Sequence, residues 1–148
     1  MAKIDVAAAP ERSGCRYPAP FDVPCRARAW KSLGDAAGLT QFGVNLCTLP
    51  PGAWSSQRHW HEREDEFVYV LTGELVLVTD AGEEILRAGD CAGFKAGTRD
   101  GHCLRNRGDL VATFLAIGSR DAADSGSYSD IDLRFTPQGF TRKDGTPY

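Results

Sequence analysis

The sequence predicts a single all-β domain built as a barrel, and three observations support this fold class. From Leu39 onward, short runs rich in β-branched and aromatic residues alternate with Gly, Pro and Asp at intervals of roughly 8–12 residues, which is typical of sandwiches and barrels. No stretch of about 12 residues keeps helical spacing, so helix is expected to be minor. The length of 148 residues is that of one domain, long enough to bury a core without disulfides.

Composition and charge exclude several classes of protein. The chain is 42% hydrophobic and 25% charged, which is ordinary for a globular protein and excludes wholesale disorder. Its 17 basic and 20 acidic residues give a net charge of −3, so the sequence predicts neither a nucleic-acid partner nor a membrane partner. No apolar run approaches the roughly 20 residues that span a bilayer. The expected partner is therefore a small molecule.

The cysteines and the N-terminus predict a cytoplasmic location. The cysteines are odd in number and lack CxxC spacing, which indicates free thiols in a reducing compartment: Cys15, Cys25, Cys47, Cys91 and Cys103. The apolar run from Ile4 to Ala9 is interrupted by Asp5 and is too short for the core of a signal peptide.

The chain divides into an arm, a barrel and an extension. Residues 1–27 hold four of the eight prolines and little periodicity, so they are expected to form an extended N-terminal arm rather than a helix. Both a free tail and an arm packed on the barrel or on a partner subunit fit this composition. The barrel is expected over residues 28–119, followed by a polar extension over 120–148 with an edge strand near 128–135.

The barrel strands are delimited by turn residues. Segments 67–70 and 75–78 are β-branched or aromatic, as half-buried strands prefer. The expected strands lie near 40–49, 56–61, 66–71, 74–79, 83–87, 91–95, 101–106 and 110–117. Glycine-containing turns separate several of them, and the glycines expected to adopt positive φ are Gly52, Gly73, Gly89 and Gly97.

The histidines form a pattern suited to a metal ion. His59 and His61 are two apart on an expected strand, so both side chains point to one face and can converge on one ion. Glu66 follows after the charged stretch 62–65, and His102 opens a later strand. Three imidazoles and one carboxylate suit divalent Mn, Fe, Ni, Zn, Co or Cu.

These residues resemble the first motif of the cupin family. That motif is Gly, a short gap, His-X-His, three or four residues, Glu, six residues and Gly. Gly52, His59, His61, Glu66 and Gly73 match it, with six residues between Gly52 and His59.

The second cupin motif is matched with one departure. It reads Gly, five residues, Pro-X-Gly, a short gap, His, three residues and Asn, and here Gly89, Gly97, His102 and Asn106 occupy its positions. Lys95 stands where proline is usual, and the gap before the histidine is longer. Since proline stiffens a turn, this departure concerns the loop rather than metal ligation.

The resemblance covers about residues 40–118 and implies a double-stranded β-helix, the cupin jelly-roll barrel. It also implies that His59, His61, Glu66 and His102 bind one divalent metal inside one end of the barrel. Four protein ligands on an octahedral ion leave two adjacent positions, which is typical of a working site rather than a closed structural one.

Three functions follow from this reading. The first is a metal-dependent enzyme acting on a small polar metabolite, an isomerase or lyase similar to sugar-phosphate-isomerase-like cupins. The alternatives are an Fe(II)-dependent dioxygenase and a non-catalytic module that binds a small molecule at its metal. Glu66 and Glu64 are the candidates for proton transfer, although Glu62, Glu64 and Asp65 also fit a solvated loop.

A homodimer is expected because barrels of this class leave exposed strand edges, which natural proteins cover. The arm and an outward-facing Trp60 are the segments expected to provide the cover.

Overall fold

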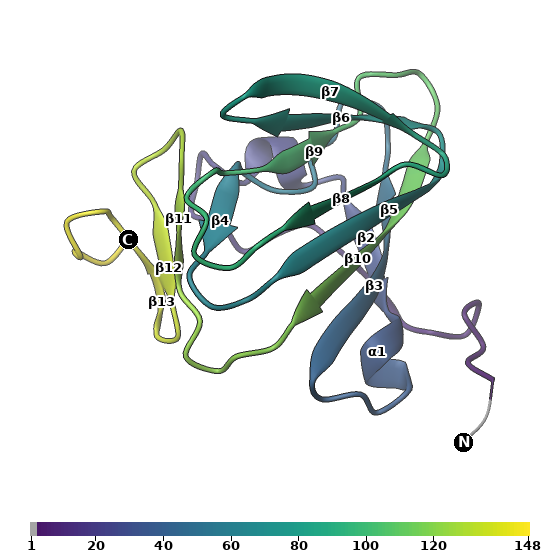
Figure 1. The fold of residues 1–148 in the computed structure, drawn as a ribbon, viewed down its shortest axis with the longest axis horizontal. Coiled ribbons are helices and arrows are strands. Elements are labelled where there is room, and N and C mark those ends of the chain that lie inside the picture. The colour runs from purple at the N-terminus through teal and green to yellow at the C-terminus, as the bar shows by residue number, and fades with distance from the viewer. Residues whose placement is uncertain (1–2) are drawn as a thin grey trace.

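The computed structural model describes residues 3–148, so residues 1–2 of the expected arm lie outside the described residues. Within this range the chain is built almost entirely from strands (Figure 1). The strands are β1 (Glu11–Ser13), β2 (Ala29–Ser32), β3 (Phe42–Leu49), β4 (His59–His61), β5 (Glu66–Thr72), β6 (Glu74–Thr79), β7 (Gly82–Arg87), β8 (Cys91–Phe94), β9 (Cys103–Arg105), β10 (Ala112–Ser119), β11 (Gly126–Tyr128), β12 (Arg134–Thr136) and β13 (Gly139–Thr141). The helical elements are the 3-10 turn η1 (Val23–Cys25) and α1 (Leu33–Ala36). None of the helices in the described range is long and apolar enough to cross a membrane.

The strands form a jelly roll, which confirms the predicted fold class. One face is a six-stranded sheet in the order β1-β2-β3-β10-β5-β8. The opposite face comprises a three-stranded sheet, β7-β6-β9, and a four-stranded sheet, β13-β12-β11-β4. An isolated bridge between His59 and His102 joins β4 to the segment just before β9. The two faces enclose the barrel interior (Figure 1).

The core follows from strict alternation along the strands. In β5, Val68 and Val70 are buried, whereas Phe67, Tyr69 and Leu71 face outward. Because successive side chains on a strand point to opposite faces, Glu66 lies on the same inner face as the two buried valines. Burial of each Leu side chain stabilises the folded state by about 1.5–3 kcal/mol. The apolar side chains that fill the interior from both faces are Leu49, Leu75, Leu77, Leu86, Leu104 and Phe114.

The glycines predicted to form turns do so, with φ of +82° at Gly52, +77° at Gly73, +97° at Gly89 and +77° at Gly97. Gly73 also lies against β10, where an added Cβ would come within 2.9 Å of the Cβ of Ala112. A side chain there would be strained by both conformation and space, so the β5–β6 turn requires glycine.

The predicted strands between residues 40 and 117 are confirmed, but β4 is shorter than expected. Residues 56–58 are not part of β4, because polar side chains of this segment bind other parts of the chain. The Gln57 amide donates to the carbonyl of Phe21 at 2.7 Å, and the half-buried Arg58 pairs with Asp130 at 2.7 Å and with Asp80.

The N-terminal arm packs on its own barrel. Residues 11–13 pair with β2, which extends the six-stranded sheet by one strand. The amide of Trp54 donates to the carbonyl of Pro24 at 2.9 Å, and Cys25 is fully buried. Of the two alternatives for this segment, the structure therefore shows the packed arm rather than a free tail.

The C-terminal extension differs from the single edge strand expected over 128–135. Its acidic loop interrupts the strand, because Asp130 turns outward to Arg58. The extension instead forms β11, which pairs with β4, followed by the hairpin β12–β13. This arrangement places the extension directly beside the histidine strand (Figure 1).

Candidate metal centre

The four side chains predicted to bind a metal converge at one end of the barrel. His59 and His61 project inward from β4, Glu66 begins β5, and His102 precedes β9. His59 and His102 exchange both backbone hydrogen bonds, at 3.2 and 2.9 Å. This bridge holds His59 and His102 in fixed relative positions without a metal ion.

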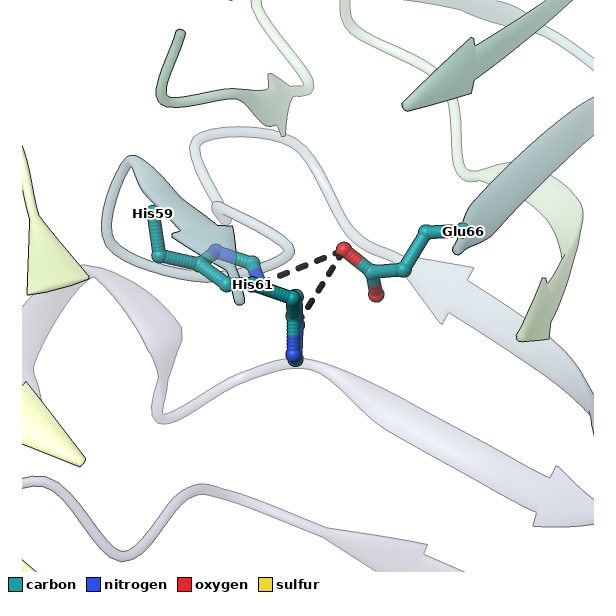
Figure 2. Close-up of side chains that lie close together, drawn as sticks. All are labelled: His59, His61 and Glu66. Carbon is teal, nitrogen blue, oxygen red and sulfur yellow. Dashed lines mark ion pairs between the residues drawn. The ribbon is translucent and has the colours of Figure 1, made fainter. Parts of the chain in front are cut away.

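The ligand atoms of these residues lie around one carboxylate oxygen. The Oε2 atom of Glu66 is 2.8 Å from Nε2 of His102, 3.3 Å from Nε2 of His61 and 3.4 Å from Nε2 of His59. Figure 2 shows Glu66 pointing toward the two histidines of β4. The set of three nitrogens and one oxygen suits a first-row divalent metal.

Hydrogen bonds fix the tautomers of two of the histidines. Nδ1 of His59 lies 3.0 Å from the carbonyl oxygen of Gln57, and Nδ1 of His61 lies 2.6 Å from Oδ2 of Asp124. Because a carbonyl or a carboxylate only accepts, each Nδ1 carries the hydrogen, and each neutral ring then presents a lone pair at Nε2. The Nε2 atom of each ring faces Glu66.

This arrangement leaves a charge for a cation to compensate. Oε2 of Glu66 is buried and, while the three rings carry no hydrogen on Nε2, accepts no hydrogen bond from the described residues. A buried carboxylate oxygen facing nitrogen lone pairs is costly unless a proton or a metal ion lies between them. The residues present therefore fit a divalent cation.

The pKa values of the histidines and of Glu66 show how protons compensate the buried carboxylate charge when no metal ion is bound. Burial alone would lower the pKa of His61, but hydrogen bonds and charges from Glu66 and Asp124 outweigh burial and raise it from 6.5 to about 9. Burial favours a higher pKa for Glu66, yet the surrounding imidazoles hold it well below its ordinary value. Burial lowers the pKa of His102. A proton on His61 thus takes the place that a cation would occupy.

Stacking against Phe94 orients the ring of His102. Phe94 stacks on its ring with centroids 3.5 Å apart and an interplanar angle of 2°. The Nδ1 atom of His102 is buried and has no partner among the described residues. Phe94 therefore both orients this ring and excludes water from one side of the site.

Three cavities meet at the histidines. A cavity of about 540 Å³ extends into the barrel toward Asn45, and one of about 610 Å³ opens toward the β12–β13 hairpin. A smaller cavity of about 270 Å³ is lined by Trp60 and Glu64. His61 lines all three, so a small ligand can approach the centre from more than one side.

Glu64 is half-buried rather than fully solvated. Its Oε1 accepts a hydrogen bond from the amide of Asp121 at 2.8 Å, and burial raises its pKa. Oxygen atoms of Glu64 and Asp124 and a ring nitrogen of His61 lie within 4.8 Å of one another. Glu64 thus lies beside the ligand set without belonging to it.

Asp65 compensates for the missing proline at position 95. Its carboxylate accepts a hydrogen bond from the amide of Ala96 at 2.8 Å, and the amide of Gly97 donates to the carbonyl of His61 at 2.8 Å. These bonds hold the turn around Lys95 against the ligand strand. The departure from the motif is therefore offset by the charged stretch before Glu66.

Trp60 is half-buried on β4, and its contribution to a dimer stays a prediction. Its half-buried ring lines the smaller cavity, and the guanidinium of Arg99 lies 5.3 Å from its centroid. The neighbouring strand β11 pairs with the edge of β4, with Ser127 opposite Trp60.

Sequence reasoning missed Asp124. This carboxylate lies in a polar, acidic stretch without a motif, and its contact with His61 depends on the pairing of β11 with β4. The pairing leaves little room, because an added Cβ at Gly126 would lie 2.1 Å from the carbonyl oxygen of Trp60.

Comparison with known proteins identifies similar chains. The Cupin_2 model of the cupin domain matches residues 45–118. A sugar phosphate isomerase of the cupin superfamily from Silicibacter pomeroyi is 47% identical, with a TM-score of 0.94 over 99% of this chain and 96% of that one. A solved structure from Acidithiobacillus ferrooxidans is 32% identical, with a TM-score of 0.72 over 78% of this chain and 74% of that one. The oxalate-binding protein of Thermotoga maritima is 36% identical over 69 residues, 47% of this chain and 54% of that protein, so the match spans about half the length of this relative.

Proposed function

The chain belongs to the cupin family, and from this premise we propose that it is a metal-dependent isomerase acting on a small polyhydroxylated metabolite such as a sugar or sugar phosphate. In this proposal His59, His61, Glu66 and His102 bind one divalent metal ion. A lyase acting on the same class of compound would use the same residues.

One observation carries the metal site. The buried Oε2 of Glu66 faces three imidazole nitrogens within 3.4 Å and has no hydrogen-bond partner besides them in the described chain. A divalent ion bound there together with one carboxylate leaves a net charge of about +1, which attracts hydroxyl and carbonyl oxygens of a substrate.

The similarity to the Silicibacter pomeroyi protein supports the reaction class. The two chains align over nearly their full lengths, including the arm and the C-terminal hairpin that surround the cavities. A sugar phosphate isomerase moves a hydrogen between adjacent carbons, which requires a group that takes and returns a proton.

The metal and Glu64 can have separate roles in this proton transfer. When bound, a divalent metal would polarise neighbouring substrate oxygens and stabilise the negative charge that develops as the proton leaves carbon. Glu64 is assigned the transfer between carbons: its carboxylate takes the proton from the carbon that bears a hydroxyl and returns it to the adjacent carbonyl carbon. The proton of the hydroxyl passes to the carbonyl oxygen in the same conversion, so that hydroxyl and carbonyl exchange places. Burial raises the pKa of Glu64, which moves it toward the range useful for a general base.

A non-catalytic binding module is the second candidate. The 36% identity with a Thermotoga maritima protein favours this candidate, because that relative is an oxalate-binding protein. In this case the open side of the metal would hold a carboxylate, and Glu64 would have no proton to move.

The decisive experiment combines metal analysis with proton NMR in D2O under anaerobic conditions. The purified protein is expected to contain one divalent metal per chain and to exchange carbon-bound hydrogen of an aldose or ketose phosphate for deuterium. Turnover that depends on oxygen would instead support the Fe(II) dioxygenase. Metal-dependent binding of oxalate without any turnover would support the binding module.

A pair of neighbouring variants tests the assignment of Glu64. The Glu64→Gln protein should bind metal but lose roughly 10²–10⁴-fold in exchange rate, the usual contribution of a general base. Glu62, two residues earlier, is exposed and serves as the matched control, so Glu62→Gln should leave the rate unchanged. Equal rates in the two variants would contradict the role of Glu64.

A further inference from the structure

Arg16 of the N-terminal arm lies where two of the cavities at the histidines meet. It lines the barrel cavity of about 540 Å³ and the hairpin cavity of about 610 Å³. Both cavities also reach His59 and His61. A ligand that reaches the metal centre through either cavity therefore passes Arg16, which is exposed.

The backbone around Arg16 is fixed on both sides. The amide of Gly14 donates to the carbonyl of Arg28 at 2.9 Å, and Nε of Arg28 donates back to the carbonyl of Gly14 at 2.8 Å. Tyr17 is largely buried, with its ring 5.3 Å from that of Tyr128 and 5.7 Å from that of Phe140. The arm thus presents Arg16 to the cavities from a rigid support.

The guanidinium of Arg16 is nevertheless available to bind a ligand. Within residues 3–148 it forms no hydrogen bond and no ion pair, unlike the other arginine of these cavities. Arg28 donates to the carbonyls of Gly14 and Ser55 and lies 5.3 Å from the centroid of Trp30. Arg28 acts as a structural cation, whereas Arg16 has all its donors available.

The charges around the two cavities favour an anionic ligand. Glu66 is the sole carboxylate among the described residues that line either of them, and a bound divalent ion would more than offset its charge. Arg16 and Arg28 add two positive charges. Field lines are focused in such a cavity, so an anion is attracted and a cation repelled.

We propose that Arg16 is the specificity-determining residue that binds an oxyanion group of the substrate, a phosphate monoester or a carboxylate. This inference rests on the proposed function. The substrate would carry oxygens for the metal at one end and the oxyanion at the other. An arginine fork binds either group through two parallel charge-assisted hydrogen bonds, which gives both affinity and orientation.

Calorimetric titration of the metal-loaded protein with inorganic phosphate, and separately with malonate, tests the proposal. Arg16→Ala should weaken binding roughly ten-fold or more, since a hydrogen bond to a charged group contributes about 1.5–3 kcal/mol. Arg16→Lys should retain part of the affinity, because it keeps the charge but loses the fork. Arg12→Ala is the matched control: Arg12 is an exposed arginine of the same arm, in β1, that lines neither cavity.

The two probes distinguish the two sources of the oxyanion. Phosphate binding that depends on Arg16 supports a phosphate monoester, and malonate binding with the same dependence, in the absence of phosphate binding, supports a carboxylate. Equal affinities in the Arg16→Ala and Arg12→Ala proteins would overturn the proposal, as would a failure of both probes to bind the wild type.

Metal content separates this inference from the proposed function. If the wild type binds no metal, the proposed function fails, and the same titrations on chelated protein still measure the contribution of Arg16. If metal binds normally but Arg16→Ala has no effect, only the oxyanion site fails. Circular dichroism of each variant establishes that the arm substitutions leave the fold intact.

Discussion

Asp124 accepts a hydrogen bond from Nδ1 of His61 at 2.6 Å, although it comes from a strand-connecting segment outside the part of the chain that matches the cupin domain. Its other oxygen accepts a hydrogen bond from the amide of Arg63 at 2.9 Å. The carboxylate therefore fixes both the ring and the backbone that follows β4. Such partners keep the nitrogen that faces the metal basic and correctly oriented.

Replacing this partner should weaken metal binding without unfolding the protein. In Asp124→Asn, the neutral amide loses the charge that supports the His61 tautomer, and metal affinity is expected to fall about 10–100-fold. Competition titrations with a chromophoric chelator measure the change. Asp109→Asn is the control, because Asp109 is exposed in a loop. An unchanged affinity in Asp124→Asn would show that the hydrogen bond does not serve the metal.

Removal of the metal should leave the barrel folded. The core between the two faces is formed by apolar side chains, so chelated protein should keep its β-rich circular dichroism. At 100 times the dissociation constant the ion contributes about 2.7 kcal/mol, which for this length is a melting shift of about 5–11 °C. Wholesale unfolding on chelation would mean that the ion is a structural requirement.

The stability of the metal-free protein should depend on pH through His61. Its pKa is raised from 6.5 to about 9, so its protonated form stabilises the folded state fully below pH 6.5. This contribution is lost as pH rises through about 9. The melting temperature of chelated wild type, relative to that of chelated His61→Asn, is expected to decline over this window. A constant difference between the two proteins from pH 6 to 10 would contradict the raised pKa.

We predict that the outer face of the six-stranded sheet forms the interface of a homodimer. Phe67, Tyr69 and Leu71 are 39%, 39% and 40% exposed, and Leu115 and Leu46 lie in line with Tyr69 across β10 and β3. A contiguous apolar sheet face of this kind marks an interaction site. The arm is occupied by its own barrel, where β1 covers the edge of β2.

Light scattering at micromolar concentration tests this prediction. The wild type is expected to be a dimer, and Tyr69→Glu should shift it toward monomer, because a charge at the centre of the face cannot be buried without a partner. Leu110→Glu is the control, since Leu110 is 77% exposed in the loop between β9 and β10, outside the strands of the sheet. A monomeric wild type would refute the dimer.

The parts of the fold that local patterns specify were predictable from the sequence. Alternation identified the barrel strands and placed His59, His61 and Glu66 on inward faces, and glycines identified the turns. The contacts made by the two ends of the chain were not predictable, because they depend on long-range pairing. Asp124 reaches His61 only through the β11–β4 ladder, and Arg16 reaches the cavities only through the packing of Tyr17.

The site is assembled from two portions of the chain, one inside and one outside the segment that matches the cupin domain. The four proposed metal ligands lie within residues 45–118, the portion that matches the family, whereas Arg16 and the hairpin that frames the cavities lie outside it. Substitutions in the two ends can therefore alter which compound the cavities accept without touching the four proposed metal ligands. Exchanging these ends between cupins offers a route to redesigning substrate choice around an unchanged ligand set.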